Sequence, residues 1–343
     1  MRHRFPSPDR LRARFDRYGR GILVAVVVAV AAQFLSDHYG VPAMLMALLL
    51  GIALHFLSEE ERCREGVDFT ARTVLRLGVA LMGARVSLAL MAGLGPALIA
   101  MVVLAVLLTI AFGMLGARLL GRDWRFGLLS GGAVAICGAS AAMAIAAVLP
   151  RDRQSERNLI FTVLSVTLLS TLAMIAYPIL SDAFALSPAM SGVFLGGTIH
   201  DVAQVVGAGF SVSEATGEVA TLVKLMRVAM LAPVVLVIAL LLRRSGAGAG
   251  AVPGAGRVPL LPGFVLGFLL LAGLNSAGVI PPALTQALAA LSRWALLVAI
   301  AAVGIKTSLR RIVEVSGQAI VLILAETLFI AGFVLIGVKA LGG

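Results

Sequence analysis

Apolar residues run along the chain in eleven long stretches that are separated by short polar turns. A helix needs about 20 apolar residues to cross a bilayer, with a range of about 17–25. The pattern therefore predicts an all-α polytopic membrane protein with about 9–11 transmembrane elements. The stretches lie near residues 21–36, 42–57, 69–93, 95–118, 126–149, 158–181, 188–210, 217–242, 259–278, 283–305 and 316–340.

The composition supports this class and excludes several others. Hydrophobic residues make up 60% of the 343 residues and charged residues 13%, whereas soluble domains average about 45–50% and about 25%. A soluble chain this apolar could not cover its surface with polar groups. Disordered, collagen-like and disulfide-scaffold classes are excluded too, and the two cysteines, Cys63 and Cys137, form no metal-binding spacing.

The elements cover nearly the whole chain, so we expect a single transmembrane domain over residues 21–343. An Arg-rich segment at 1–20 precedes it, and no cleavable signal peptide is evident there. A stretch rich in Gly, Ala and Pro at 243–259 predicts a flexible cytoplasmic loop.

The net charge of +11 would suggest a nucleic-acid partner in a soluble chain. Here the basic residues lie between apolar runs and indicate topology, because Lys and Arg concentrate in cytoplasmic loops. Alternation from a cytoplasmic N-terminus places the Lys/Arg-rich loops inside and the loops without Lys or Arg outside. The inside loops are 58–72, 118–125, 243–257 and 306–311, and the outside loops are 36–41, 211–216 and 278–282.

One loop contradicts this alternation. Arg151, Arg153 and Arg157 would lie outside if the 126–149 element crossed the membrane, and inside if it were a re-entrant hairpin. Both this element and the 188–210 element have polar, Gly-rich centres, which membranes tolerate only where protein buries them or water reaches them. We therefore predict two broken elements, either hairpins or interrupted spans, and the charge pattern favours hairpins.

An internal repeat also emerges at an offset of 221 residues. Residues 80–88 align with 301–309, so that Arg85 matches Lys306, and the same offset maps 95–118 onto 316–339. The paired elements run in opposite directions in the predicted topology. Inverted-topology repeats of this kind are typical of secondary transporters.

Ionisable residues inside membrane segments are costly and mark functional sites by default. Arg85 and Lys306 form a pseudo-symmetric pair of cations at the two mouths of a pathway, unless their side chains snorkel to the interface. Lys224 and Arg227 share one face of the 217–242 helix. They point either to anion binding or to structural pairing with a carboxylate such as Asp201.

The broken elements supply the other site residues. Glycine-rich breaks expose backbone N–H groups at the start of the next half-helix, where anions are attracted. The predicted substrate-binding residues near or facing the breaks are Cys137, Gly138, Ser140, His200 and Gln204, with Cys137 acting by packing rather than as a nucleophile.

Three residues are predicted to couple transport to an ion gradient. His200 titrates near neutral pH when unperturbed, and Asp201 either takes part in coupling or caps a half-helix. Glu326 lies near the middle of the last apolar stretch.

Four motifs in this sequence resemble the YeiH family, which is also called a sulfate exporter family, a name that rests on prediction. They are residues 77–85, 135–141, 199–209 and 224–228, and the similarity runs from about residue 22 to the C-terminus. The resemblance implies a multi-pass protein of the bacterial inner membrane. It also implies kinship with cation/proton antiporters and anion transporters, which have two inverted repeats and crossing broken helices or hairpins.

The leading interpretation is a secondary active transporter that exports a small anion, such as sulfate or a sulfonate, by alternating access. No Gly-x-x-x-x-Gly-Lys-Ser/Thr motif occurs, so the energy would come from a gradient. A sodium- or proton-coupled carrier of an organic carboxylate or a cation remains the alternative, and a channel or an intramembrane enzyme is disfavoured. We expect no enzyme activity, cofactor, metal or nucleic-acid partner. The expected partners are the anion, a coupling proton or sodium ion and the bilayer, and a homodimer is left open.

Overall fold

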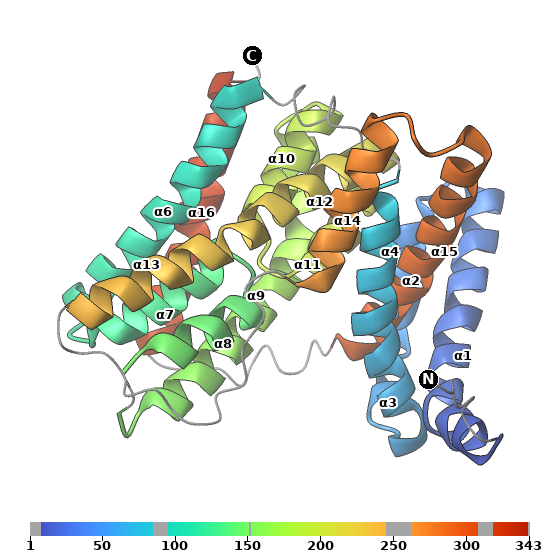
Figure 1. Ribbon diagram of the computed structural model, residues 1–343, viewed down its shortest axis with the longest axis horizontal. Coiled ribbons are helices and arrows are strands. Elements are labelled where there is room, and N and C mark those ends of the chain that lie inside the picture. Colours follow the sequence, from blue (N-terminus) through green and yellow to red (C-terminus); the bar gives the residue numbers. More distant parts are fainter. Residues whose placement is uncertain (1–7, 85–94, 151, 245–261, 308–317, 342–343) are drawn as a thin grey trace, which may run out of the picture. The chain divides into compact units, whose positions relative to one another are not determined.

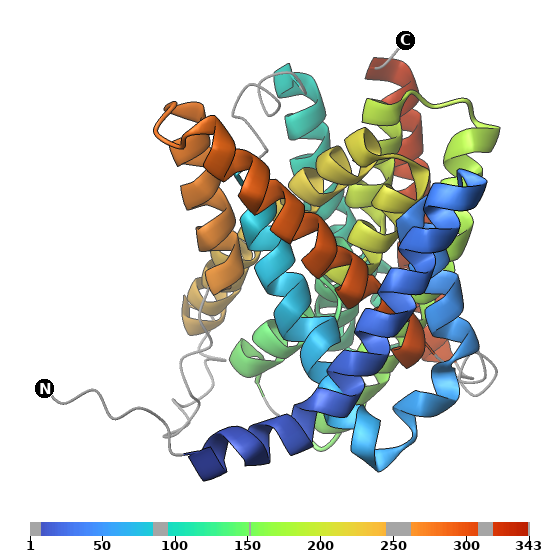
Figure 2. The ribbon, with the colours of Figure 1, turned by 90° about the vertical axis from the view of Figure 1, so that its right-hand side faces the viewer.

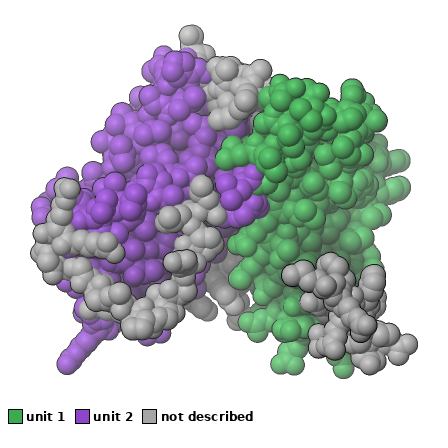
Figure 3. Space-filling model, in the orientation of Figure 1, with its two compact units in different colours: residues 1–85, 267–309 green, residues 86–266, 310–343 purple. Residues whose placement is uncertain are grey.

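The computed structural model describes residues 8–84, 95–150, 152–244, 262–307 and 318–341. Within these ranges the regular structure is entirely helical, which confirms the predicted all-α class. The chain separates into two compact units (Figure 3). Unit 1 comprises Met1–Arg85 and Gly267–Leu309, and unit 2 comprises Val86–Leu266 and Arg310–Gly343.

Unit 1 is held together by close helix crossings at glycines. A Cβ atom on Gly21 of α1 would lie 2.2 Å from the Cys63 carbonyl of α3, and one on Gly51 of α2 would lie 2.4 Å from a carbonyl of α15. These backbones touch because no side chain separates them. Figure 2 shows α15 in orange-red and α1 in blue. The elements of unit 1 are α1 (Pro8–Tyr39), α2 (Ala43–Ala53), η1 (His55–Ser58), α3 (Glu61–Phe69), η2 (Thr70–Val74), α4 (Leu75–Met82) and α15 (Pro282–Lys306).

Unit 2 contains the two broken elements and the helices that pack on them (Figure 1). Its elements are α6 (Gly95–Leu119), α7 (Trp124–Ala135), α8 (Ala139–Val148), α9 (Ser155–Ala183), α10 (Pro188–Thr198), α11 (Val202–Val212), α12 (Glu214–Ala229), α13 (Leu231–Arg244) and α16 (Gln318–Leu341). The remaining helix, α14 (Gly263–Ser276), spans the boundary between the units.

In the described part of the chain, six helices are long and apolar enough to cross a membrane. The helices follow the predicted apolar stretches, with three differences. The first of these helices continues back through the Arg-rich segment, because α1 begins at Pro8. The 217–242 stretch divides into α12 and α13, since Pro233 has no backbone N–H to donate to the Ala229 carbonyl. The 69–93 stretch is helical to Met82, and residues 85–94 lie outside the described ranges.

The 126–149 element is a hairpin, the first hairpin (α7–α8). At its open end, the Arg125 guanidinium donates to the Asp152 carboxylate across 3.3 Å, so the two ends of the element lie together. Along its length, Ile145 of α8 lies against Gly132 of α7. The chain reverses at Ile136–Gly138, where Gly138 adopts a φ of +60° that residues with a Cβ rarely adopt.

The 188–210 element is also a hairpin, the second hairpin (α10–α11). Its open end is closed by the Thr216 hydroxyl, which donates to the Pro188 carbonyl across 3.1 Å. Gly196 of α10 and Gly209 of α11 both face Ala220 of α12, so the two arms lie along the same stretch of α12. Figure 1 shows this hairpin and the first one extending in opposite directions within unit 2.

Each hairpin is long enough to reach the middle of a bilayer. An arm of 12 residues, such as α7, spans about 18 Å, which is a little over half of the roughly 30 Å hydrocarbon core. Of the two predicted forms, the structure therefore has hairpins rather than interrupted spans. The inverted repeat and the cytoplasmic N-terminus stay predictions, as does the single domain over 21–343.

Candidate functional site

The tips of the two hairpins meet at Lys224 of α12. The Lys224 ammonium donates to the Ile136 carbonyl of the first tip across 2.6 Å and to the Ile199 carbonyl of the second tip across 3.0 Å. The side chain is fully buried. An ammonium has three N–H donors, so one donor remains beyond these two bonds.

Arg227 binds the same two tips one helical turn later. Its guanidinium donates to the carbonyls of Val134 and Ala135 in the first hairpin, each at 2.8 Å. It also donates to the carbonyls of Gly196 at 3.0 Å and Ile199 at 3.1 Å in the second hairpin. These carbonyls lie at the C-terminal ends of α7 and α10. No further helical turn follows there to supply N–H donors for them.

The environment of these cations differs from the predicted structural pairing with a carboxylate, while anion binding stays a prediction. Neither ammonium nor guanidinium forms an ion pair with a carboxylate among the described residues, and both are occupied mainly by backbone carbonyls. The negative ends of two helix dipoles therefore take the place of a carboxylate partner. Because the cations are fully buried, they stabilise the contact between the tips rather than facing lipid.

The charges at the tips sum to an excess of positive charge. Each helix end carries about half an elementary charge, so the C-terminal ends of α7 and α10 cancel the N-terminal ends of α8 and α11. Lys224, Arg227 and Asp201 then contribute +2 and −1. Asp201 and Cys137 are both close enough to Lys224 to interact with it electrostatically. With His200 neutral, one more negative charge would balance the tips.

The returning arms of the two hairpins begin differently. In the second hairpin, the Asp201 carboxylate caps α11 by accepting from the Ala203 N–H across 2.8 Å. The Ser170 hydroxyl of α9 accepts from the backbone N–H groups of His200 and Asp201. In the first hairpin, α8 follows Gly138, which offers no side-chain cap. The Cys137 sulfur accepts from the Ala141 N–H in the first turn of α8. The N–H groups of Ala139 and Ser140 precede the first intrahelical bond and are donors of the kind that an anion can use.

A second contact between the hairpins runs through α16. Thr327 donates its hydroxyl to the Ile323 carbonyl, so it accepts from the His200 imidazole, whose Nε2 lies 3.1 Å away in the second tip. The preceding residue, Glu326, accepts from the Ser130 hydroxyl of α7 across 2.7 Å. Two consecutive residues of α16 thus bind one hairpin each.

The Glu326 carboxyl group is buried in a narrow space. Its side chain is fully buried, and a Cβ atom on Gly113 of α6 would lie 2.5 Å from Oε1. The other oxygen, Oε2, has no hydrogen-bond partner among the described residues. Ser130 precedes Ile136 by six residues, so Glu326 meets α7 about 9 Å along the helix from the tip.

The other predicted residues fall into several environments. Gln204 is buried, donates to the Thr171 hydroxyl across 2.8 Å and leaves its Oε1 unpaired. The Cys137 side chain is buried in the first tip, as expected of a packing residue. The Ser140 side chain is exposed in the first turn of α8, and its role in substrate binding stays a prediction.

Of the predicted pair of mouth cations, Arg85 and Lys306, the structure describes only Lys306. Arg85 lies outside the described residues. Lys306 belongs to unit 1, where its ammonium forms an ion pair with Asp68 across 2.5 Å at the end of α15. Its role in binding stays a prediction, and in this structure its charge has a carboxylate partner.

The comparisons with known proteins define the family. The model of the family described as conserved hypothetical protein 698 matches residues 20–323. A UPF0324 membrane protein from Rhizobium meliloti is 63% identical over 95% of this chain and 94% of its own length. UPF0324 membrane protein TauZ from Paracoccus denitrificans is 62% identical over 98% of each chain, and a relative from Chlorobaculum tepidum is 54% identical over 94% of this chain and 90% of its own.

The chain belongs to the UPF0324 family. This membership confirms the family resemblance predicted from the four motifs. The UPF0324 relatives are named membrane proteins, and the chain has six apolar helices of spanning length in its described part, so it is a multi-pass membrane protein.

Sequence reasoning missed the hydroxyl partners of this UPF0324 site. They lie on otherwise apolar helices. Three of them bind a residue or backbone group of the second hairpin, and these are Ser170, Thr171 and Thr327. The fourth, Ser130 of the first hairpin, binds Glu326 of α16. The available signal was their burial pattern, because hydroxyl residues at spacings of three to five line one face of α9. In the part of the chain that the structure describes, no group of His, Cys, Asp and Glu side chains is arranged to hold a metal ion.

Proposed function

We propose that this protein is a secondary transporter that carries a small oxyanion, such as sulfate or a sulfonate, by alternating access. The observation that carries the proposal is the pair of buried cations, Lys224 and Arg227, at the junction of two hairpin tips. Among the described residues, Asp201 is the carboxylate that acts electrostatically on Lys224. A buried excess of positive charge is costly unless an anion balances it.

The anion would bind at the start of α8. The uncapped first turn offers backbone N–H groups there, and the remaining N–H donor of Lys224 belongs to the same tip. Backbone donors at a helix N-terminus recognise oxyanions without metal ions. In the present conformation the tips are buried, so binding requires a conformational change that admits water to them, as alternating access provides.

Glu326 is the proposed coupling group, with His200 as its link to the second tip. The two hairpins bind neighbouring residues of α16, so a proton arriving at Glu326 would change the first of these contacts. A neutral Glu326 leaves the tips with one excess positive charge, and an ionised Glu326 removes that excess. Joint movement of one proton and one singly charged anion, such as a sulfonate, therefore keeps the buried charge balanced, and sulfate, with two negative charges, would require a second proton.

Buried oxygen atoms without a hydrogen-bond partner among the described residues support a second candidate function, which is the binding of sodium or another cation. Oε1 of Gln204 and the hydroxyl of Ser165 are buried without a partner among the described residues, and neutral oxygens suit sodium. They favour sodium as the coupling ion, or a cation as the cargo. Export as the direction, the inner membrane as the location and the absence of enzyme activity belong to the same proposal.

Counterflow in proteoliposomes tests the proposal. Proteoliposomes that contain the wild-type protein and unlabelled internal sulfate should accumulate radiolabelled sulfate from outside. They do so because each internal sulfate that leaves through the alternating site is exchanged for a labelled external one. Sulfite, a sulfonate and a dicarboxylate should be compared as internal anions, with sodium and pH gradients imposed separately.

Lys224→Gln provides the decisive variant. It removes the charge and the spare donor, so anion exchange should fall at least about tenfold, the equivalent of one strong charged hydrogen bond. Arg118→Gln, at an exposed position on α6, is the control and should exchange normally. Equal exchange by all three proteins would refute the anion site.

A further inference from the structure

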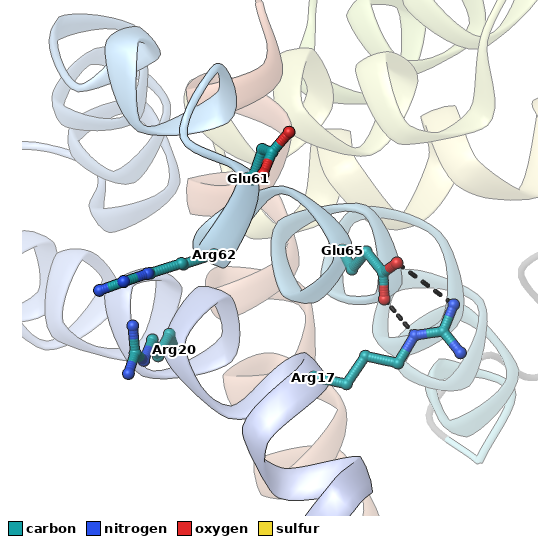
Figure 4. Close-up of a pocket in the computed structure, with 5 residues that line it drawn as sticks. All are labelled: Arg17, Arg20, Glu61, Arg62 and Glu65. Atoms are coloured by element: carbon teal, nitrogen blue, oxygen red, sulfur yellow. Dashed lines mark hydrogen bonds and ion pairs between the residues drawn. The ribbon is translucent and has the colours of Figure 1, made fainter.

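A second cationic site lies on unit 1, where α1 crosses α3. The pocket there is lined by Arg17, Arg20, Glu61, Arg62 and Glu65. Figure 4 shows the guanidinium groups of Arg20 and Arg62 directed toward one another, while the Glu61 carboxylate points away from them. Arg17 lies apart from this pair and binds Glu65.

Arg20 and Arg62 have no carboxylate partner among the side chains that the structure describes. Arg17 is neutralised by Glu65 through two N–H donors, and that guanidinium holds the pKa of the Glu65 carboxyl below its ordinary value. Neither Arg20 nor Arg62 forms an ion pair with any residue that the structure describes. Two guanidinium groups converging without an acid between them form a natural site for an anion with several oxygens.

The base of this site is rigid. Gly21 of α1 and Gly66 of α3 lie at the crossing, where a Cβ atom on either residue would come within 2.2 Å of a backbone carbonyl of the other helix. The Tyr18 ring also packs on Phe69, with ring centroids 5.3 Å apart. The spacing of the two arginines is therefore fixed by backbone contact and not by flexible loops.

The helix face below Arg20 is apolar and exposed. Leu23, Val27, Val30 and Phe34 follow Arg20 at alternating spacings of three and four and are 63%, 59%, 53% and 67% exposed. Residues at these spacings share one side of a helix. Arg20 itself stands at the start of the apolar window of α1, which is the depth of lipid headgroups.

We propose that Arg20 and Arg62 bind the phosphate of an anionic phospholipid whose acyl chain lies along this face of α1. The cationic pair lies at headgroup depth, and an apolar face continues from it along α1. This arrangement matches a lipid rather than a free anion, because only a lipid has an acyl chain that can contact the apolar face. The inference is independent of the transported substrate.

Native mass spectrometry of the full-length protein in detergent tests this proposal with phosphatidylglycerol as the probe. The double variant Arg20→Gln/Arg62→Gln should bind the lipid about thirtyfold more weakly, at about fivefold for each arginine near a lipid surface. The matched control is Arg64→Gln/Arg118→Gln, which removes two exposed arginines elsewhere and should bind as the wild type does. Phosphatidylcholine should bind all three proteins weakly and equally.

Two results would overturn the proposal. One is equal binding of phosphatidylglycerol by the two double variants. The other is displacement of the lipid by millimolar inorganic phosphate or glycerol phosphate, which would assign the arginines to a soluble anion. All four arginines are exposed, so these variants should fold, and a thermal unfolding curve for each verifies this.

Discussion

The two hairpins have the same architecture and opposite chemistry at their returning arms. In both, the arm that enters ends in carbonyls bound by Lys224 and Arg227. In the second hairpin, Asp201 and Ser170 then satisfy the start of α11. In the first, Gly138 leaves the start of α8 without a side-chain cap. The second hairpin thus carries its own carboxylate at the start of the returning arm, and the first hairpin, where the anion site is proposed, carries none.

The two cations at the junction of the tips also differ in how many of their N–H donors the carbonyls occupy. Arg227 donates at least four hydrogen bonds to the carbonyls of both tips, which leaves at most one of its five N–H donors. Lys224 donates two hydrogen bonds and has one further N–H donor. Both remain predicted substrate-binding residues, and the number of donors still available distinguishes them.

Removal of the Arg227 side chain should have the largest effect on stability. Arg227→Met would leave carbonyls of both hairpins buried without donors, at about 1–3 kcal/mol each, so a total loss of at least about 3 kcal/mol is expected. Chemical unfolding in detergent measures it, and Arg118→Met is the exposed control. A stability equal to that of the control would mean that the tips do not depend on this guanidinium.

Asp201 tests the cap of the second hairpin. Asp201→Ala removes the acceptor for the Ala203 N–H and should lower stability by about 1 kcal/mol, as for other N-caps. Asp201→Asn keeps an acceptor and should be nearly as stable as the wild type.

The Asn variant also separates capping from coupling. Because it removes the negative charge at the tips, it should alter the pH dependence of anion exchange in proteoliposomes. An unchanged pH profile would assign Asp201 to capping alone.

Glu326 tests whether α16 links the two hairpins. Glu326→Gln keeps an acceptor for Ser130, so the fold should persist, but the side chain can no longer exchange a proton. Sulfate exchange driven by a pH gradient should disappear while exchange at equal pH continues. Arg118→Gln, at an exposed position on α6, serves as the control and should retain the pH-driven component.

Asp152, at the open end of the first hairpin, should give the smallest effect. The Ser155 hydroxyl, the Gln154 N–H and the Arg125 guanidinium hold the pKa of Asp152 below its ordinary value of 3.8. A lowered pKa means that the carboxylate stabilises the fold above about pH 4 and that this contribution is lost as pH falls through the folded-state pKa. Asp152→Asn should therefore lower stability at pH 7 by less than about 1 kcal/mol.

The measurement for Asp152 is thermal unfolding at pH 7 and near pH 3. The wild type and Asp152→Asn should differ at the higher pH and converge at the lower one. A difference that persists unchanged at pH 3 would show that the Asp152 charge is not its source.

The sequence predicted the hairpins well because their signals are local. Gly-rich polar centres at mid-element and the misplaced arginines 151, 153 and 157 both indicated that the chain turns back inside the membrane. The break between α12 and α13 was missed although Pro233 marks it, because the apolar stretch continues without interruption.

The partners within the site could not be predicted, because they are distant in sequence and chemically generic. Ser130 and Glu326 are 196 residues apart, and nothing about an isolated serine in an apolar helix identifies its partner. The carbonyls that bind Lys224 and Arg227 carry no sequence signal at all, since every residue has one. Pairing with a carboxylate was one of the two expectations for these cations. The helix-end carbonyls take the place of the carboxylate, and only the three-dimensional arrangement of the helices shows this.

Labelling of Cys137 measures most directly whether the tips form a water-reachable anion site. A Cys63→Ser background leaves this buried residue of the first tip as the sole thiol. In proteoliposomes, a small charged methanethiosulfonate should label Cys137 slowly, and a transported anion such as sulfate should slow the labelling further. A labelling rate that no transported anion changes would contradict an anion site at the junction of the two hairpins.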